Sequence, residues 1–286
     1  MYHYTSRIVL AVRVALATGR PLLVRGPSGG GKSSLARHVA RVLEADYVDQ
    51  VITSRTQAQD LLWTVDHIRR LRDAHANQLR LIEEYVLPGV LWRAFDPVSA
   101  ARQAARAAET RPAGTAPVHS TDLSPPRRAV VLLDEIDKAD PDVPNNLLVA
   151  LGSLEFLVHD TGETVRADPR GTPLVILTTN NERDLPAAFL RRCVELDLPV
   201  PDGARLVTIG RLHFEADLNP TVEAIAGLLV PGPPQADQPG SAVVSIAEFL
   251  DCVRACRELG VTPGSAEWRE VVEMTVWKHG RAPSQG

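Results

Sequence analysis

The stretch Pro21-Leu22-Leu23-Val24-Arg25-Gly26-Pro27-Ser28-Gly29-Gly30-Gly31-Lys32-Ser33-Ser34 decides the fold of this chain. It runs from an apolar segment into a glycine-rich loop, and residues 35–43 continue with a helical pattern. The spacing matches G-x-x-x-x-G-K-[ST], with Gly26, Gly31, Lys32 and Ser33 at the fixed positions. The sequence therefore predicts a phosphate-binding loop between a strand and a helix.

The residue types in this loop suit the binding of a nucleoside triphosphate. Glycines allow backbone N–H groups to wrap a phosphate chain, and the start of the helix adds a positive dipole end. Lys32 supplies a charge for the β- and γ-phosphates, and the Ser33 hydroxyl can ligate Mg²⁺. We predict that ATP and Mg²⁺ bind to Gly26, Pro27, Ser28, Gly29, Gly30, Gly31, Lys32, Ser33 and Ser34. The alternative is a strand-to-helix turn that binds nothing.

The composition is that of an ordinary globular protein. The chain has 286 residues, 44% hydrophobic and 23% charged, which is enough for one large domain or two modest ones. Its net charge of -4 gives no basic field for nucleic acid. No apolar run approaches the ~20 residues of a membrane span, and the N-terminus does not resemble a signal peptide, so we expect a cytoplasmic protein. The three cysteines have neither disulfide nor zinc spacing.

A second apolar run, residues 129–133, ends in Asp134 and Glu135. Five consecutive apolar residues indicate a buried strand, and ligands bind at the carboxyl ends of strands in parallel sheets. We therefore expect Asp134 to coordinate Mg²⁺ and Glu135 to polarise the attacking water. The alternative is a strand that simply ends in solvated acids.

Two further segments complete the candidate site. Residues 174–178 predict another buried strand, and Asn180 near its tip can hold the attacking water against the γ-phosphate. A short predicted helix, residues 187–190, is followed by Arg191 and Arg192.

The rest of the chain predicts the domain organisation. The arginine-rich residues 66–80 form either a solvated surface segment or an insertion that faces a partner. Residues 101–128 are interpreted as a mobile surface loop, and residues 156–167 as a β-hairpin. From Pro201 onward only helical patterns follow. We expect an α/β domain with a parallel sheet in residues 1–200 and a small all-α lid in residues 201–286.

Taken together, these motifs resemble those of AAA+ ATPases, and within them the MoxR-like group. The resemblance rests on residues 26–33 (Walker A), 130–139 (Walker B), 177–180 (sensor 1) and 185–193 (the arginine-finger segment). It implies a ring, commonly a hexamer, with ATP between subunits and Arg192, or its neighbour Arg191, acting on the next subunit. Either arginine could instead pair with Glu195 or another acid. The resemblance also implies a chaperone-like remodeller of a protein partner, often a von Willebrand factor A-type protein.

One position departs from the family pattern. Many members carry a sensor 2 arginine where this chain has Glu267. Arg254 or Arg257 could substitute for it, the alignment could be shifted, or sensor 2 could be missing. Two other functions remain open: a nucleic-acid-associated loader, which the acidic charge disfavours, and a small-molecule kinase, which Glu135 and Asn180 disfavour.

Overall fold

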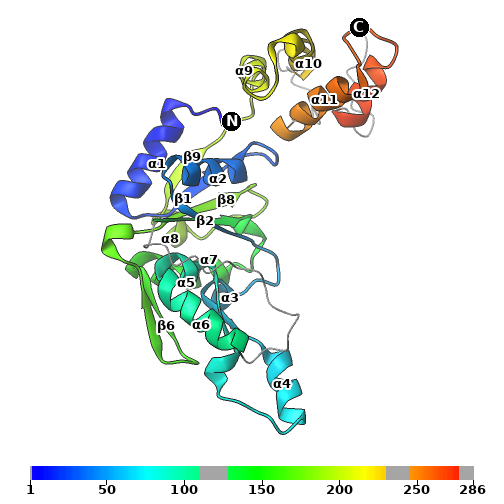
Figure 1. The fold of residues 1–286 in the computed structure, drawn as a ribbon. Coiled ribbons are helices and arrows are strands. Elements are labelled where there is room, and N and C mark those ends of the chain that lie inside the picture. Colours follow the sequence, from blue (N-terminus) through cyan, green and yellow to red (C-terminus); the bar gives the residue numbers. More distant parts are fainter. Residues whose placement is uncertain (1, 110–127, 230–244, 277–286) are drawn as a thin grey trace. The chain divides into compact units, whose positions relative to one another are not determined.

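The computed structural model describes residues 2–109, 128–229 and 245–276 (Figure 1). Two compact units make up the chain. The sheet unit contains residues 6–25 and 36–196, and the lid unit contains residues 1–5, 26–35 and 197–286. The phosphate-binding loop thus belongs to the lid unit, and the domain boundary at residue 200 stays a prediction. Among the described residues, no helix is long and apolar enough to cross a membrane.

A five-stranded sheet in the order β2-β5-β8-β1-β9 is the centre of the sheet unit. Its strands are β1 (Leu22–Arg25), β2 (Asp46–Val51), β5 (Ala129–Asp134), β8 (Leu174–Thr179) and β9 (Val194–Asp197). The pairs β1–β8, β5–β8 and β2–β5 are parallel. Every residue of β8 is buried, whereas the edge strand β2 is mostly exposed. Continuous apolar runs therefore form the central strands, as the sequence predicts.

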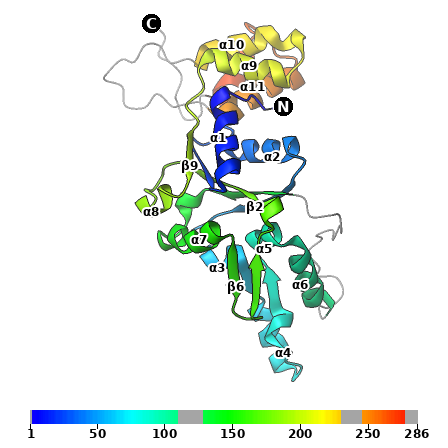
Figure 2. The same cartoon turned by 90° about the vertical axis from the view of Figure 1, so that its left-hand side faces the viewer.

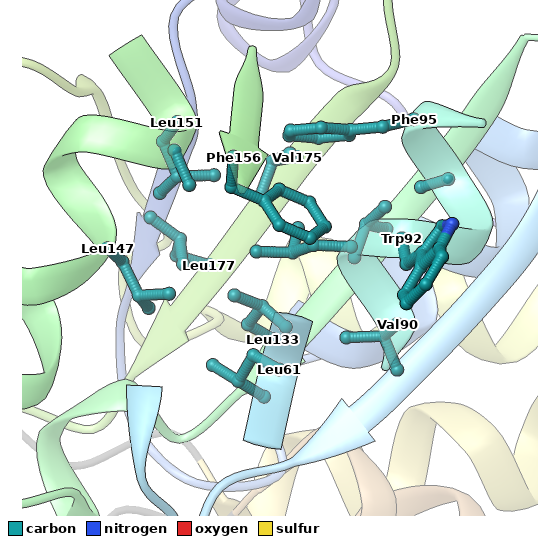
Figure 3. Close-up of a cluster of buried hydrophobic side chains, with 14 of the residues drawn as sticks. Leu61, Val90, Trp92, Phe95, Leu133, Leu147, Leu151, Phe156, Val175 and Leu177 are labelled. Atoms are coloured by element: carbon teal, nitrogen blue, oxygen red, sulfur yellow. The ribbon is translucent and has the colours of Figure 1, made fainter. Parts of the chain in front are cut away.

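Helices cover both faces of this sheet. In both views α1 (Ser6–Thr18) and α2 (Lys32–Val42) lie on one side, and α5 (Val90–Phe95) and α7 (Asp142–Ser153) lie on the other (Figures 1 and 2). Side chains such as Leu133, Leu177 and Trp92 fill the space between the sheet and the second helical layer (Figure 3). Because β1, β5 and β8 are parallel, their carboxyl ends lie at one edge of this packed sheet.

Two inserted segments extend from the sheet. The first is α3 (Ala58–Leu62), β3 (Trp63–Val65), α4 (His67–His75), η1 (Ile82–Tyr85), β4 (Val86–Pro88) and α6 (Pro97–Glu109), with β3 and β4 paired antiparallel. The second is the predicted hairpin, β6 (Glu155–Val158) and β7 (Glu163–Arg166). The Trp63 indole N–H donates to Asp160 at 2.8 Å, so β3 of the first insertion is joined to the turn of the hairpin.

The predicted loop at residues 101–128 is wrong over its first part, because residues 101–109 belong to α6. Alanines and arginines favour a helix, and Gln103 and Ala107 on its inner face are buried. Gln103 Nε2 donates to the carbonyl oxygens of Glu83 and Val86 at 2.6 and 3.0 Å. Residues 110–127 lie outside the described part of the chain.

In its described residues, the lid unit contains four longer helices, α9 (Gly203–His213), α10 (Asn219–Leu229), α11 (Ile246–Leu259) and α12 (Trp268–Thr275). The lid unit also has the 3-10 turn η4 (Ala216–Leu218). The remaining short elements belong to the sheet unit: the 3-10 turns η2 (Ile136–Lys138) and η3 (Pro169–Gly171) and the helix α8 (Ala187–Leu190). Asp202 caps α9 by accepting from the Arg205 N–H. Cys252 and Cys256 are buried in the helical core with Phe249, where they pack as small apolar groups.

Candidate active site

The loop between β1 and α2 has the backbone that its glycines allow. Gly26, Gly29 and Gly31 have φ angles of +150°, +68° and +87°, which side chains strongly disfavour. The Lys32 side chain is 6% exposed and folds back over the loop. Its Nζ donates to the carbonyl oxygens of Gly26 and Pro27, each at 2.8 Å. The loop is therefore wrapped around a buried ammonium group.

Two of these glycines also allow close approach by other parts of the lid unit. A Cβ at Gly26 would lie 2.5 Å from the carbonyl oxygen of Leu198, and one at Gly29 would lie 2.4 Å from Cβ of Ser245. Ser245 is the N-cap of α11, where it forms a capping box with Glu248. The glycine pattern is thus required by packing as well as by the chemistry that the sequence predicts.

Tyr2 contacts the same loop, and the sequence analysis did not identify it. A Cβ at Gly31 would lie 3.6 Å from the Tyr2 ring, which meets the Tyr4 ring edge-on at a centroid distance of 5.1 Å. Burial raises the pKa of Tyr2 to about 12, with nearby Arg205 acting in the opposite direction. The available signal was two aromatic residues within the first four of a chain that is only 5% aromatic.

In the sheet unit, a buried hydroxyl joins the two carboxylates at the end of β5. Thr178 on the neighbouring strand β8 donates through Oγ1 to Asp134 Oδ1 at 2.5 Å, and accepts from the Glu135 N–H at 2.8 Å. Glu135 itself has a left-handed backbone, with φ +62°. The hydroxyl of Thr178 therefore fixes both the Asp134 side chain and the backbone direction of Glu135.

The Glu135 carboxylate has two partners. Asn180 Nδ2 donates to its Oε1 at 3.2 Å, and Lys138 Nζ lies 2.7 Å from its Oε2. The hydrogen bond to Glu135 is the main cause that raises the pKa of Lys138. The structure thus brings Asp134, Glu135 and Asn180 together, and adds Thr178 and Lys138, which the sequence analysis did not assign. Thr178 lies within the sensor 1 segment and Lys138 within the Walker B segment, so position in the motif was the available signal.

A buried acid shapes the segment that follows β8. Asp137 is 3% exposed, and its Oδ2 accepts from the Glu182 N–H at 2.9 Å. Thr179 Oγ1 accepts from the Asn181 N–H at 2.9 Å, and Asn181 has φ +59°. These contacts fix the backbone on either side of Asn180.

Both candidate finger arginines are exposed to solvent. Arg192 donates to the carbonyl oxygen of Ala188 at 3.2 Å, and neither it nor Arg191 meets a carboxylate within the described residues. Glu195 instead pairs with Arg25, at 2.8 Å. The expected alternative, an internal pair with Glu195, is therefore wrong for both arginines. Their action on another subunit stays a prediction.

The candidate sensor 2 residues have local roles. Glu267 is the N-cap of α12 and makes no capping hydrogen bond. Arg254 pairs with Asp251 at 2.7 Å, while Arg257 pairs with Glu258 and lies over the Phe214 ring at 5.9 Å. The pairing of Arg254 and Arg257 with surface acids gives no support to either as a substitute.

The residues present fit the ligands that the sequence predicts. The loop offers backbone N–H groups at a helix start together with Lys32, which suits a phosphate chain. Asp134 and Ser33 offer the oxygen donors that Mg²⁺ prefers. The loop belongs to the lid unit and the β5–β8 network to the sheet unit.

The fold, the loop and the carboxylates at the end of β5 define a P-loop nucleotide-binding protein of the AAA+ class. Residues 21–193 match the AAA domain (dynein-related subfamily), so the chain belongs to that family. Its members are, as a class, nucleotide-hydrolysing ATPases. No curated protein matches the chain.

The solved structures that are similar to the chain include two point mutants of RuvB from Thermotoga maritima. One RuvB mutant gives 14% identity and a TM-score of 0.53 over 94% of this chain and 68% of that one. The other gives 15% identity and a TM-score of 0.51 over 94% and 67%. An inferred ATPase from Cytophaga hutchinsonii gives 16% identity and a TM-score of 0.46; the match covers 78% of this chain and only 56% of that one. At these identities the likeness to RuvB shows the fold alone.

Proposed function

We propose that this chain hydrolyses ATP to ADP and phosphate as the motor of a MoxR-like, chaperone-like machine that remodels a protein partner. The observation that carries the proposal is the carboxylate of Glu135, held between Asn180 Nδ2 at 3.2 Å and Lys138 Nζ at 2.7 Å beside Asp134. An oriented carboxylate beside a metal-binding acid suits the activation of water.

Chain connectivity supports a single site. The strands β1, β5 and β8 run parallel, so their carboxyl ends lie at one edge of the sheet. The loop leaves β1 at that edge, where Asp134, Glu135 and Asn180 also emerge. When bound, ATP with Mg²⁺ supplies the phosphoanhydride bond that is broken. Lys32 and the loop N–H groups would bind the phosphates, Ser33 and Asp134 would hold the metal ion, and Glu135 would accept a proton from water.

The water-activating role is tested by Glu135→Gln. Glutamine keeps the shape and the Asn180 contact but cannot accept the proton, so we expect turnover to fall by roughly 100-fold or more with ATP affinity retained. Turnover is measured by phosphate release and affinity by a fluorescent ATP analogue. Glu223→Gln is the control, because Glu223 is a 53% exposed carboxylate paired with Arg211 in the lid unit. Wild-type turnover in Glu135→Gln would refute the assignment.

We further propose a homo-oligomeric ring, a hexamer, in which Arg192 acts on the nucleotide of the neighbouring subunit, with Arg191 as the alternative. The exposure of Arg192, which meets no carboxylate within residues 2–109, 128–229 and 245–276, supports this. Mixing Arg192→Ala with Lys32→Ala subunits should restore part of the lost hydrolysis, because each interface pairing an intact finger with an intact loop would work. Assembly is followed by light scattering. No restored hydrolysis, with both variants still assembling, would contradict the arrangement.

A further inference from the structure

In helix α4 the usual placement of side chains is reversed, with apolar residues exposed and an arginine buried. Ile68 and Leu71 are 84% and 61% exposed, whereas Arg69 is 4% exposed. A surface helix normally turns its apolar side inward and its charges outward. Here the apolar side chains lie on the outside, which indicates a surface that contacts something beyond this unit.

The buried arginine explains why the helix is held in this orientation. Arg69 Nη1 donates to the carbonyl oxygens of Ala107 and Glu84, at 2.8 and 3.3 Å. Its guanidinium lies 5.0 Å from the centre of the Tyr85 ring, and the Tyr85 hydroxyl donates to Asp73 at 2.9 Å. Arg69 and Asp73 are four residues apart, so they fix one side of α4 against η1 and α6. The opposite side must then face outward.

That opposite side is both apolar and basic. Ile68, Leu71, Arg72 and His75 follow the i, i+3, i+4, i+7 spacing of one helix face, which we call the α4 outer face. All four are exposed, and Arg72 has no acidic partner in the described chain. The nearby acids are already engaged, because Glu83 pairs with Arg106, and Glu84 with Arg80.

The α4 outer face is presented away from the sheet. Both views place α4 at the end of the sheet unit that lies farthest from the five-stranded sheet (Figures 1 and 2). Exposed aliphatic side chains continue in the segment that follows, where Leu79 and Leu81 are 56% and 65% exposed. The position and the chemistry of the α4 outer face both suit contact with another molecule.

We propose that the α4 outer face docks an acidic, amphipathic segment of a protein partner. Aliphatic side chains would fit between the exposed Ile68 and Leu71, and carboxylates would meet Arg72. This inference rests on the proposed function, because the segment would belong to the partner on which the motor acts.

The chemistry favours this occupant over two others. Nucleic acid would leave Ile68 and Leu71 without suitable contacts, and the outer face contains no Phe, Tyr or Trp for base stacking. The chain as a whole carries a net charge of -4. A second copy packed symmetrically through the same face would bring like charges together. A basic apolar face is complementary to an acidic apolar segment.

The test is selection from a displayed library of random peptides of roughly 16 residues against the full chain without nucleotide. We expect enrichment of Asp and Glu together with Leu, Ile and Phe. A selected peptide, labelled with fluorescein, is then titrated with protein variants. Ile68→Gln with Leu71→Gln should weaken binding by about tenfold or more, because the apolar contacts are lost. Arg72→Glu should also weaken it and reduce its dependence on salt.

Matched controls separate this face from general surface effects. Met274→Gln removes a 70% exposed apolar side chain from α12, and Arg13→Glu reverses an exposed arginine on α1; neither should change peptide binding. Any of these results would overturn the proposal: no enrichment, enrichment of basic or neutral peptides, binding unchanged in the α4 variants, a loss confined to DNA binding, or a change only in self-association. Turnover is measured separately, so an inactive chain that still selects acidic peptides would refute only the proposed hydrolysis.

Discussion

Replacing Thr178 with valine tests whether one hydroxyl organises the end of β5. Valine has almost the same shape, and Thr178 is completely buried, so the change removes the hydroxyl and little else. The bond to the Asp134 carboxylate is lost, and hydrogen bonds to charged groups contribute ~1.5–3 kcal/mol. The Glu135 N–H also loses its 2.8 Å acceptor, and an unpaired N–H in a partly buried place costs ~1–3 kcal/mol.

Because water can replace part of these contacts, we expect the free energy of unfolding to fall by about 2–4 kcal/mol. Urea unfolding followed by tryptophan fluorescence measures it, as the shift in midpoint multiplied by the slope. ATP turnover should also fall, since the backbone direction of Glu135 is no longer fixed.

Thr208→Val is the matched control for Thr178→Val. The Thr208 hydroxyl donates to the carbonyl oxygen of Ala204 at 2.9 Å on the exposed side of α9, so its loss should change stability little. If Thr178→Val unfolds at the same urea concentration as this control, the hydroxyl does not organise the strand end. Unchanged turnover would refute its role in holding Glu135.

Three further predictions concern other parts of the fold. Burial raises the pKa of Cys193 and of Cys256 to about 12, which disfavours the reactive thiolate at pH 8, so Ellman's reagent should label the folded chain at least ~1000-fold more slowly than the chain in urea. Fast labelling of the folded chain would contradict their burial. Trp63→Phe removes the indole N–H bond to Asp160, so the free energy of unfolding measured in urea should fall by about 2–4 kcal/mol; an unchanged midpoint would show that the two insertions are not joined there. Gly26→Ala places a methyl group 2.5 Å from a backbone carbonyl oxygen, so affinity for a fluorescent ATP analogue should be lost, and wild-type affinity would refute the loop geometry.

Features set by local sequence could be predicted. Strands β5 and β8 were predictable because five or more consecutive apolar residues fill a central strand on both faces. The capping of α9 by Asp202 and the hairpin turn at Gly162, with φ +70°, follow from residues close in sequence. Asp134, Glu135 and Asn180 were found for the same reason, since strand ends bring motif residues together.

Features that depend on distant partners could not be predicted. The burial of Arg69 requires the carbonyl of Ala107, 38 positions away, which itself lies in a helix mistaken for a loop. An arginine-rich sequence normally indicates a solvated face, and nothing local marks Arg69 as the buried arginine of residues 66–80. Thr178 likewise acquires its role from the register of β8 against β5, in which Leu177 lies beside Leu133.

The backbone of Glu135 links the fold to its proposed chemistry. Among the described residues other than glycine, positive φ angles occur at Glu44, Asn77, Glu135, Leu154 and Asn181. Glu44, Asn77 and Leu154 follow the ends of helices, where a left-handed residue commonly terminates the helix. Asn181 belongs to a residue type that tolerates this conformation. Glu135 has neither explanation, because it lies between β5 and η2 and glutamate is poorly suited to a conformation that costs ~1–2 kcal/mol. Glycine or asparagine would relieve that strain but would lose the carboxylate that Asn180 and Lys138 contact. The strain is therefore best explained by a requirement for a carboxylate at this position, which is what the activation of water demands.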